Sequence, residues 1–280
     1  MIRPSRIGDE AGLKTLWQVA FGDSMEQIEA FFDALYQPGM AIVWDAEGTI
    51  ASALYLLDAG ITPLSGGGSL STSYSYALAT LPAYRGQGIG SQVTRATIAH
   101  SFDLGFDCNV ICPAEESLFP YYMGLGYTVT LPIAETTVLR AEFTTSAIIH
   151  KIMSTDFSSY SQLRSAYLQA GSTIYTDDYL RYLAQVCEAL DGGLYHLELK
   201  DSTAFCAVSR SDDRLFIREF LPASHVVYGT QALLQHFDLS TAIVRTVATE
   251  PLQQRPFALV TYAGEQRLPP ETGYFPFVLD

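Results

Sequence analysis

The stretch SYALATLPAYRGQGIGS, residues 75–91, decides the fold of this chain. Residues 70–80, LSTSYSYALAT, alternate between apolar and polar and predict a strand that runs into this stretch. A glycine-rich turn follows over 82–90, and apolar residues at helical spacing then predict a helix over 91–104. An apolar run over 106–112 predicts the next strand. A strand–helix–strand unit of this kind favours two parallel strands that are neighbours or near neighbours, so the sequence predicts a mixed α/β sheet.

The turn has the chemistry of an anion-binding site. The first turn of a helix offers unpaired N–H groups and the positive end of the peptide dipoles, and both favour a diphosphate. Gly86, Gly88 and Gly90 would let the backbone approach phosphate oxygens with no Cβ in the way. Arg85 adds a positive charge. An ordinary glycine-rich turn is the alternative interpretation.

Two common nucleotide-binding patterns do not fit this turn. A dinucleotide site of the Rossmann type uses Gly-x-Gly-x-x-Gly, whereas the spacing here is Gly86-x-Gly88-x-Gly90. A P-loop needs Gly-Lys-Ser/Thr, which the chain lacks at this place.

The string LPAYRGQGIG, residues 81–90, resembles motif A of the GNAT acetyltransferase superfamily, written Gln/Arg-x-x-Gly-x-Gly/Ala. Arg85, Gly88 and Gly90 match that motif. Downstream, EESLFPYYMGLGY, residues 115–127, is similar to the motif B of the family, in which a tyrosine precedes a Gly-Phe/Tyr pair. Tyr122 falls on that tyrosine, and Glu115 stands where many members have Asn.

The resemblance implies acetyl-CoA as co-substrate, with a set of binding residues at the end of the strand and in the turn. The backbone of Leu78 and Thr80 would pair with the pantetheine arm, and the strand would splay from the strand over 106–112. The expected binding residues are Leu78, Ala79, Thr80, Arg85, Gly86, Gln87, Gly88, Ile89, Gly90 and Ser91.

Two catalytic residues follow from the same resemblance. Tyr122 would protonate the departing CoA thiolate, which is reasonable chemistry for a phenol close to the sulfur. A purely packing role is its alternative, and Tyr121 could take its place. In similar enzymes with a second GNAT-like domain the terminal carboxylate reaches the active site, which here makes Asp280 a candidate; the alternative is a last strand docked in the second domain.

A general base is not identified by the sequence. Asp33, Asp58 and Glu115 are carboxylates expected near the site, and a solvated acid is the common alternative for each. No metal-ligand or triad spacing links the five histidines, and each is expected to be a surface or satisfied residue: His100, His150, His196, His225 and His236. The four cysteines fit buried reduced thiols better than a zinc site, so no metal is expected.

The chain is expected to hold two domains, a GNAT acetyltransferase domain over residues 1–143 and a degenerate GNAT-like domain over 144–280. Before the turn we expect a strand over 2–7, helices over 5–21 and 25–35, strands over 40–45 and 49–57, and a loop over 60–68. After it we expect a short helix over 117–125 and strand from Tyr127 through 136–139. The second half predicts a similar order of elements: helices 157–170 and 177–190, strands 194–199, 203–209 and 214–221, a helix 227–237, and strands 242–246 and 257–263.

The second half lacks a glycine turn at LPASHVVYG, residues 221–229, so we do not expect it to bind CoA. We expect it to wall off the acceptor site or to form a surface between copies in a homo-oligomer.

The composition of the chain limits the classes of partner that it is expected to bind. Of 280 residues, 48% are hydrophobic and 16% charged, which is ample for a core, and no apolar run reaches the roughly 18–20 residues of a membrane span. With no apolar stretch of the signal-peptide kind at the N-terminus, we expect a soluble, cytoplasmic protein with no membrane partner. The net charge of −14 disfavours nucleic acid and favours a cationic acceptor.

The sequence therefore predicts an N-acetyltransferase acting on a primary amine of a small molecule, such as a polyamine, an aminoglycoside-like compound or an amino-acid derivative. A protein N-terminus or lysine is an alternative acceptor. A CoA-binding sensor without catalysis, or a purely structural partner protein, is an alternative of another class.

Overall fold

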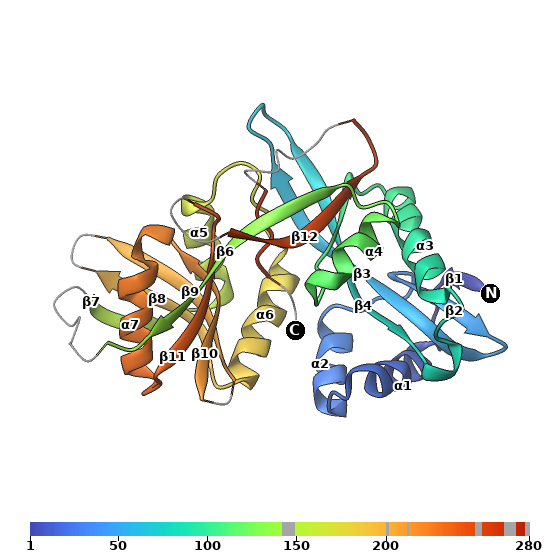
Figure 1. Cartoon of the computed structure of the whole chain (residues 1–280), viewed down its shortest axis with the longest axis horizontal. Coiled ribbons are helices and arrows are strands. Elements are labelled where there is room, and N and C mark those ends of the chain that lie inside the picture. The colour runs from blue at the N-terminus through green and yellow to red at the C-terminus, as the bar shows by residue number, and fades with distance from the viewer. Residues whose placement is uncertain (142–148, 200–201, 212, 250–253, 266–272, 278–280) are drawn as a thin grey trace. The chain divides into compact units, whose positions relative to one another are not determined.

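A computed structural model describes residues 1–141, 149–199, 202–211, 213–249, 254–265 and 273–277 (Figure 1). The chain forms two compact units. Unit 1 comprises residues 1–130 and 258–268, and unit 2 comprises residues 131–257 and 269–280. The chain thus leaves unit 1 after Thr130 and returns to it with one late strand. The two predicted domains, residues 1–143 and 144–280, stay a prediction.

The described strands of unit 1 lie in the order β1-β2-β3-β4-β5-β12. Its elements are β1 (Ile2–Pro4), α1 (Glu10–Phe21), α2 (Met25–Ala34), β2 (Ala41–Ala46), β3 (Thr49–Pro63), β4 (Ser69–Thr80), the 3₁₀ turn η1 (Pro82–Tyr84), α3 (Ile89–Asp103), β5 (Cys108–Ile111), the 3₁₀ turn η2 (Glu116–Leu118), α4 (Phe119–Met123) and the part of β12 (Gln254–Tyr262) from Ala258 on.

Helices cover both faces of the unit 1 sheet (Figure 1). On one face, Trp17 of α1 and Phe31 of α2 pack against Tyr55 of β3, with ring centroids 5.2 and 5.3 Å from that of Tyr55. On the other, Ile89 and Val93 of α3 form a buried cluster with residues of β2 and β3. Strand residues alternate between faces, so the neighbours Leu54 and Tyr55 serve the two different clusters. The sheet is thereby fixed from both sides.

The strand–helix–strand prediction is confirmed. Strands β4 and β5 are parallel neighbours, in register from Thr72 with Cys108 to Ser75 with Ile111, and α3 connects them. The other partners of both strands are antiparallel, β3 on β4 and β12 on β5. The sheet is mixed, as predicted.

Unit 2 holds its strands in the order β6-β11-β10-β9-β8-β7. Its elements are β6 (Val129–Leu139), most of which lies in this unit, β7 (Ile149–Ser154), α5 (Phe157–Tyr167), α6 (Asp177–Ala189), β8 (Gly193–Leu199), β9 (Thr203–Ser211), β10 (Arg214–Leu221), the 3₁₀ turn η3 (Ala223–His225), α7 (Val226–His236) and β11 (Thr241–Thr246).

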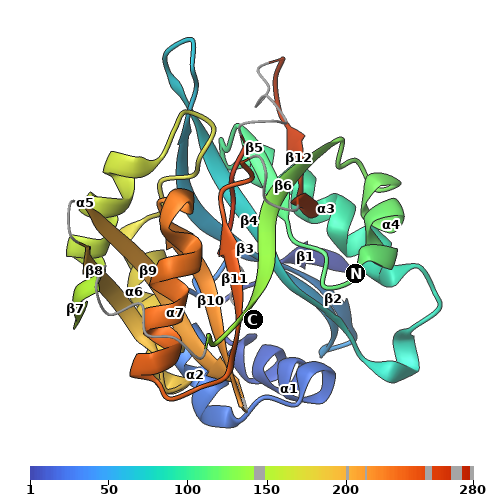
Figure 2. The same ribbon diagram turned by 60° about the vertical axis from the view of Figure 1, so that its left-hand side comes forward.

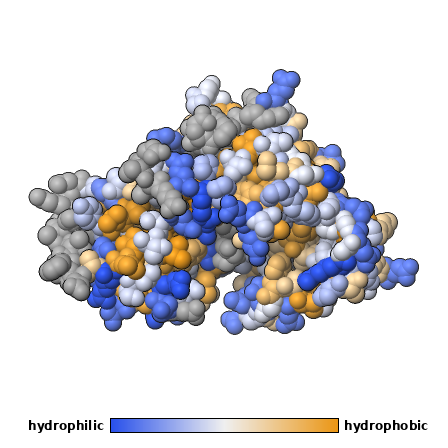
Figure 3. Space-filling view, viewed as in Figure 1, coloured by the Kyte–Doolittle hydropathy of each residue, from blue (hydrophilic) through white to orange (hydrophobic). Residues whose placement is uncertain are grey.

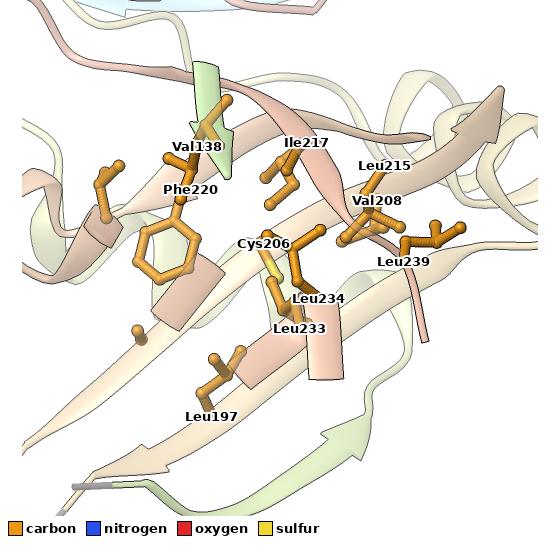
Figure 4. Packing of buried hydrophobic residues seen from close by; sticks show 14 of the residues in the cluster. Val138, Leu197, Cys206, Val208, Leu215, Ile217, Phe220, Leu233, Leu234 and Leu239 are labelled. Carbon is orange, nitrogen blue, oxygen red and sulfur yellow. The ribbon is translucent and has the colours of Figure 1, made fainter. Parts of the chain in front are cut away.

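Helix α7 packs on one face of the unit 2 sheet through Leu233 and Leu234 (Figures 2 and 4). These leucines belong to a cluster with Ile217, Phe220 and Val244 of β10 and β11. Figure 3 shows further apolar side chains on the surface over α7, where Val227 and Tyr228 are exposed. The core of unit 2 therefore lies between α7 and the central strands.

A buried ion pair ties α5 to the same sheet. Arg164 of α5 and Glu219 of β10 are 2% and 0% exposed, and Arg164 Nε lies 2.9 Å from Glu219 Oε2. The Tyr160 hydroxyl donates to the same carboxylate at 2.7 Å. Glu219 is adjacent to Phe220, which faces α7, so alternation puts α5 on the opposite face. A charge this deeply buried needs its partner to be tolerated.

The described part of the C-terminal segment is docked on unit 2. Tyr274, Phe275 and Phe277 are fully buried, and Tyr274 forms a β-bridge with Ser172. The Tyr179 hydroxyl donates to the Phe277 carbonyl at 2.8 Å. The segment is therefore anchored up to Phe277.

The structure differs from several predicted elements. The first helix begins at Glu10 rather than residue 5, because the Asp9 carboxylate accepts the Arg6 N–H at 2.8 Å and Gly8 takes a φ of +97°. The predicted loop over 60–68 is shorter in the structure: β3 runs to Pro63 through an irregular register between Asp58 and Gly60, and a turn over 64–68 leads to β4. Strand β7 was not predicted.

The strand expected from Tyr127 through 136–139 is strand β6, which begins at Val129 and ends at Leu139. None of the four cysteines, all of which are described, forms a disulfide. Among the helices that the structure describes, none offers the run of apolar residues that a membrane span requires.

Candidate active site

The ladder between β4 and β5 ends before β4 does. Its last pair is Ser75 with Ile111, whereas β4 continues to Thr80 and stays paired with β3, where Thr80 lies opposite Ser52. Ala77 has a φ of +55° at an irregularity in the β3–β4 register. Within the described residues, Leu78–Thr80 therefore have no strand on their second edge. This is the place where the sequence predicts a splay.

The glycine turn leaves its amides open. The Arg85 N–H is bonded to the Pro82 carbonyl, and Gln92 is the next residue whose N–H finds an acceptor, in Gly88. No described residue accepts a hydrogen bond from any of the N–H groups of residues 86–91. Six consecutive unsatisfied donors at the start of a 15-residue helix are the arrangement that anions bind.

The three glycines of the turn are not equivalent. Gly86 and Gly88 take φ values of +75° and +73°, a region that favours glycine, and nothing lies within 4 Å of the place where a Cβ would stand on either. Gly90 is helical, and a Cβ there would meet Tyr121 Oη at 3.6 Å, Thr80 Oγ1 at 3.7 Å and Leu78 Cδ2 at 3.8 Å. Glycine is therefore required at residues 86 and 88 by the path of the chain, whereas the position of Gly90 allows a methyl group.

The polar side chains of the turn bond back to the backbone. Arg85 Nε donates to the Thr80 carbonyl at 2.9 Å, and Gln87 Nε2 donates to the Ala83 carbonyl at 3.3 Å. Arg85 thus occupies one lone pair of a carbonyl that the sequence assigns to the pantetheine arm. Both side chains are exposed, and both stabilise the turn itself.

Hydrogen bonds from β3 and packing against α3 and α4 hold the end of β4 in place. The Ser52 hydroxyl donates to the Ala79 carbonyl at 2.7 Å and lies 2.8 Å from Thr80 Oγ1. Leu78 packs against two buried clusters, one with Ile89 of α3 and one with Tyr122 of α4. The strand end, the turn and α4 are therefore in direct contact.

Tyr122 is a mostly buried phenol. It is 7% exposed and packs with Ile111, Leu125 and Leu259. Burial raises the pKa of Tyr122 to about 12, and the neighbouring Tyr121 adds to this. Its hydroxyl has no hydrogen-bond partner among the described residues. A phenol with this pKa keeps its proton at neutral pH and can act as a proton donor.

Tyr121 points to the turn instead. Its hydroxyl lies 3.1 Å from Ser91 Oγ, in the first turn of α3, and the side chain is 37% exposed. The rings of Tyr121 and Tyr122 are 5.0 Å apart, at 69°. Tyr121 therefore contacts the start of α3, whereas Tyr122 packs in the cluster with Ile111. The sequence does not predict this position of Tyr121.

A buried polar network lies just before the end of the β4–β5 ladder. Asn109 of β5 accepts hydrogen bonds from the Tyr127 hydroxyl at 2.6 Å and from Ser75 Oγ at 2.9 Å, and donates to Ser73 Oγ at 2.8 Å. The members are at most 2% exposed. Satisfied networks of this kind fix a unique geometry. Serines in β4 alternating with tyrosines were the only signal for it in the sequence.

The other predicted residues are less informative. Asp280 lies outside the described residues. His100 Nε2 is 2.8 Å from the Gly39 carbonyl, as expected for a satisfied histidine. Glu115 is exposed and accepts a hydrogen bond from Ser117 Oγ at 3.3 Å. The structure assigns no general base among Asp33, Asp58 and Glu115.

Unit 2 repeats the ladder of unit 1 but not its turn. Strands β10 and β11 are parallel from Arg214 with Thr241 to Ile217 with Val244, after which the Thr246 hydroxyl donates to the Phe220 carbonyl at 2.6 Å. Helix α7 starts directly after η3, whereas α3 starts five residues after η1 ends. The Phe220 ring fills the space beside Gly229. Unit 2 thus has no counterpart of the open glycine turn among its described residues.

Comparison with known proteins agrees with this geometry. The family model "Acetyltransferase (GNAT) domain" matches residues 1–130. No curated protein sequence matches the chain significantly.

Solved structures share the fold over nearly the whole chain, at low sequence identity. The chain is similar to a conserved protein of Enterococcus faecalis V583 described as "Probable N-Acyltransferase", with a TM-score of 0.67, 13% identity, and coverage of 94% of this chain and 72% of that one. It is similar to a GCN5-related N-acetyltransferase of Kribbella flavida (TM-score 0.63, 14% identity, 93% and 70% covered). It is also similar to Eis1 of Mycobacterium abscessus, with a TM-score of 0.63, 13% identity, and coverage of 94% of this chain and 73% of that one.

The fold of both units is therefore shared with proteins of the GNAT type, while the sequence match is confined to the half that carries the glycine turn. Residues 1–130 of this chain are a GNAT acetyltransferase domain.

Proposed function

We propose that this chain is an N-acetyltransferase that moves the acetyl group of acetyl-CoA directly to a primary amine of a small molecule. The observation that carries the proposal is the row of open N–H groups over residues 86–91, placed where β4 ends without a strand on its second edge. A diphosphate joined to an extended arm fits both features, because the amides suit the phosphates and the strand edge suits the pantetheine amides.

The roles of the residues follow from their places. The N–H groups of Gly86, Gly88, Gly90 and Ser91 hold the diphosphate, and the backbone of Leu78 and Thr80 pairs with the pantetheine arm. Arg85 and Gln87 keep the turn in shape through their bonds to the backbone. Ala79 and Ile89 are buried, and they fix the strand end and the start of α3.

The chemistry is a direct transfer. The neutral amine attacks the thioester carbonyl carbon, and the C–S bond of the resulting tetrahedral intermediate breaks to release CoA as a thiolate. Tyr122 donates its proton to that thiolate, since its buried phenol is protonated at neutral pH. The amine nitrogen loses a proton to a carboxylate, for which the C-terminal Asp280 is the candidate.

The acceptor class follows from charge. The chain carries a formal charge of −14, so a cationic acceptor is favoured over an anionic one through steering. A polyamine, an aminoglycoside-like compound and an amino-acid derivative all present a primary amine, and the first two carry several positive charges.

A panel of amines, assayed with acetyl-CoA for release of thiol, tests the proposal. We expect amine-dependent thiol release that saturates in both substrates, together with an acetylated product seen by mass spectrometry. Binding of acetyl-CoA without turnover on small amines or peptides would instead support a CoA-binding sensor. Turnover on peptides alone would support a protein N-acetyltransferase.

A further inference from the structure

Tyr121 links α4 to the first turn of α3. Its hydroxyl lies 3.1 Å from Ser91 Oγ, and it is the nearest atom to the place where a Cβ on Gly90 would stand. The N–H groups of Gly90 and Ser91 are among those that find no acceptor in the described residues. Two side-chain hydroxyls and several open amides therefore meet at the same helix start.

The hydroxyl pair is suited to an anion. A serine hydroxyl has one proton and two lone pairs, so Ser91 can accept the proton of Tyr121 and still donate its own. Donation to a phosphate oxygen is charge-assisted, which makes it stronger than a bond between neutral groups. The phenol is 37% exposed, so it is also accessible to a ligand.

We propose that Tyr121 and Ser91 form a hydroxyl pair that binds the diphosphate of the co-substrate, which makes Tyr121 a further binding residue of this site. The proposal rests on the proposed function, since it takes the diphosphate of acetyl-CoA as the ligand. It separates the two adjacent tyrosines: Tyr121 binds the phosphate end of the co-substrate, and Tyr122 serves the sulfur end.

Two acetyl donors test this separation. Acetyl-CoA carries the diphosphate, whereas S-acetylpantetheine carries the same thioester and arm without it. We expect Tyr121→Phe to raise the KM for acetyl-CoA about 10-fold, because the Ser91 hydroxyl that donates to the phosphate loses the partner that orients it. With S-acetylpantetheine, kcat/KM should stay within about 2-fold of the wild-type value, because no phosphate is present.

Two further variants sharpen the test. Ser91→Ala should likewise raise the KM for acetyl-CoA and leave the reaction with S-acetylpantetheine unchanged. In the double variant the KM for acetyl-CoA should be about that of the more impaired single variant, because both substitutions remove the same hydroxyl pair. Tyr167→Phe is the matched control: Tyr167 is 38% exposed and its hydroxyl lies 3.2 Å from Thr203 Oγ1, in unit 2. This variant should change neither the KM for acetyl-CoA nor the kcat/KM with S-acetylpantetheine.

An equal loss with both donors would overturn the inference, since Tyr121 would then act only through the shape of α4. An unchanged KM for acetyl-CoA in both single variants would overturn it as well. If the wild-type protein transfers no acetyl group, the proposed function fails. In that case the affinity for CoA, measured by calorimetry, still decides the inference: Tyr121→Phe should weaken it about 10-fold, and equal affinities would reject it.

Discussion

Ser75 and Ile111 form the last residue pair of the parallel ladder between β4 and β5, and β4 runs five residues beyond it. Ser75 is also held by its hydrogen bond to the buried Asn109. The end of the ladder is therefore fixed by side chains as well as by backbone. What lies beyond that pair, the free strand edge and the glycine turn, is the basis of the proposed co-substrate site.

The glycines of the turn give a first prediction. Gly88→Ala should weaken CoA binding at least about 10-fold, because a side chain at a φ of +73° is strained and the loop must shift to relieve it. Gly90→Ala is the matched control, since a methyl group there makes only ordinary contacts at 3.6–3.8 Å. We expect less than about a 3-fold change for it. Calorimetry with CoA measures both, and equal losses would contradict the account.

Tyr122 gives the second prediction. Tyr122→Phe keeps the packing against Ile111 and Leu125 but removes the proton donor. We expect kcat at saturating acetyl-CoA to fall about 10²-fold to 10⁴-fold, the usual contribution of general acid catalysis, with the affinity for CoA unchanged. Steady-state rates and calorimetry separate the two effects. Full activity of this variant would reduce Tyr122 to a packing residue.

The C-terminal segment gives the third prediction. Deletion of Val278–Asp280 removes the terminal carboxylate from its place but keeps Phe277, which is anchored by Tyr179 and by the Tyr175 hydroxyl. We expect kcat to fall about 10-fold or more, as for the loss of a general base, while the Tm stays the same. Asp280→Asn is the control, because it retains the terminal carboxylate and should remain active. Unchanged transfer by the deleted protein with an intact fold would reject the role of the C-terminus.

The buried ion pair of unit 2 gives the fourth prediction. Arg164→Ala leaves the Glu219 carboxylate buried and without its cation, so the free energy of unfolding should fall by about 3–5 kcal/mol. Arg181→Ala breaks the exposed pair with Asp178, and a change below about 1 kcal/mol is expected. Denaturant unfolding measures both variants. Similar values for the two would show that burial does not decide the energy of these pairs.

The sequence predicted the central part of unit 1 well, because there several signals agree. Alternation in β4, the glycine turn and the helical spacing after it all specify one strand–turn–helix unit, which the structure contains. Glycines with positive φ at residues 86 and 88 are required by that path. Local pattern and tertiary structure coincide at this place.

The prediction failed where a single side chain overrides the pattern. The sequence predicts the first helix from residue 5, but the Asp9 carboxylate accepts the Arg6 N–H and the helix begins at Glu10. Gly60, with a φ of +108°, looks like a loop residue yet lies at an irregularity inside β3. Strand β7 is a short edge strand without clear alternation.

The site could be predicted only where it lies in one stretch of sequence. The glycine turn and its helix are contiguous, so their chemistry is visible before the fold is known. The pairing of Tyr121 with Ser91 joins residues 30 positions apart, and the network of Asn109 with Ser73 joins residues 36 positions apart. Such contacts depend on the packing of α4 and β5, and no periodicity records them.

The central claim is that the amides of residues 86–91 hold a diphosphate, and an NMR titration of the ¹⁵N-labelled protein with CoA tests it most directly. We expect the amide resonances of Gly86, Gly88, Gly90 and Ser91 to move downfield together as CoA is added, because each N–H gains a charged acceptor. S-acetylpantetheine should leave them in place. CoA that binds while these four resonances stay fixed, and others move, would contradict the account.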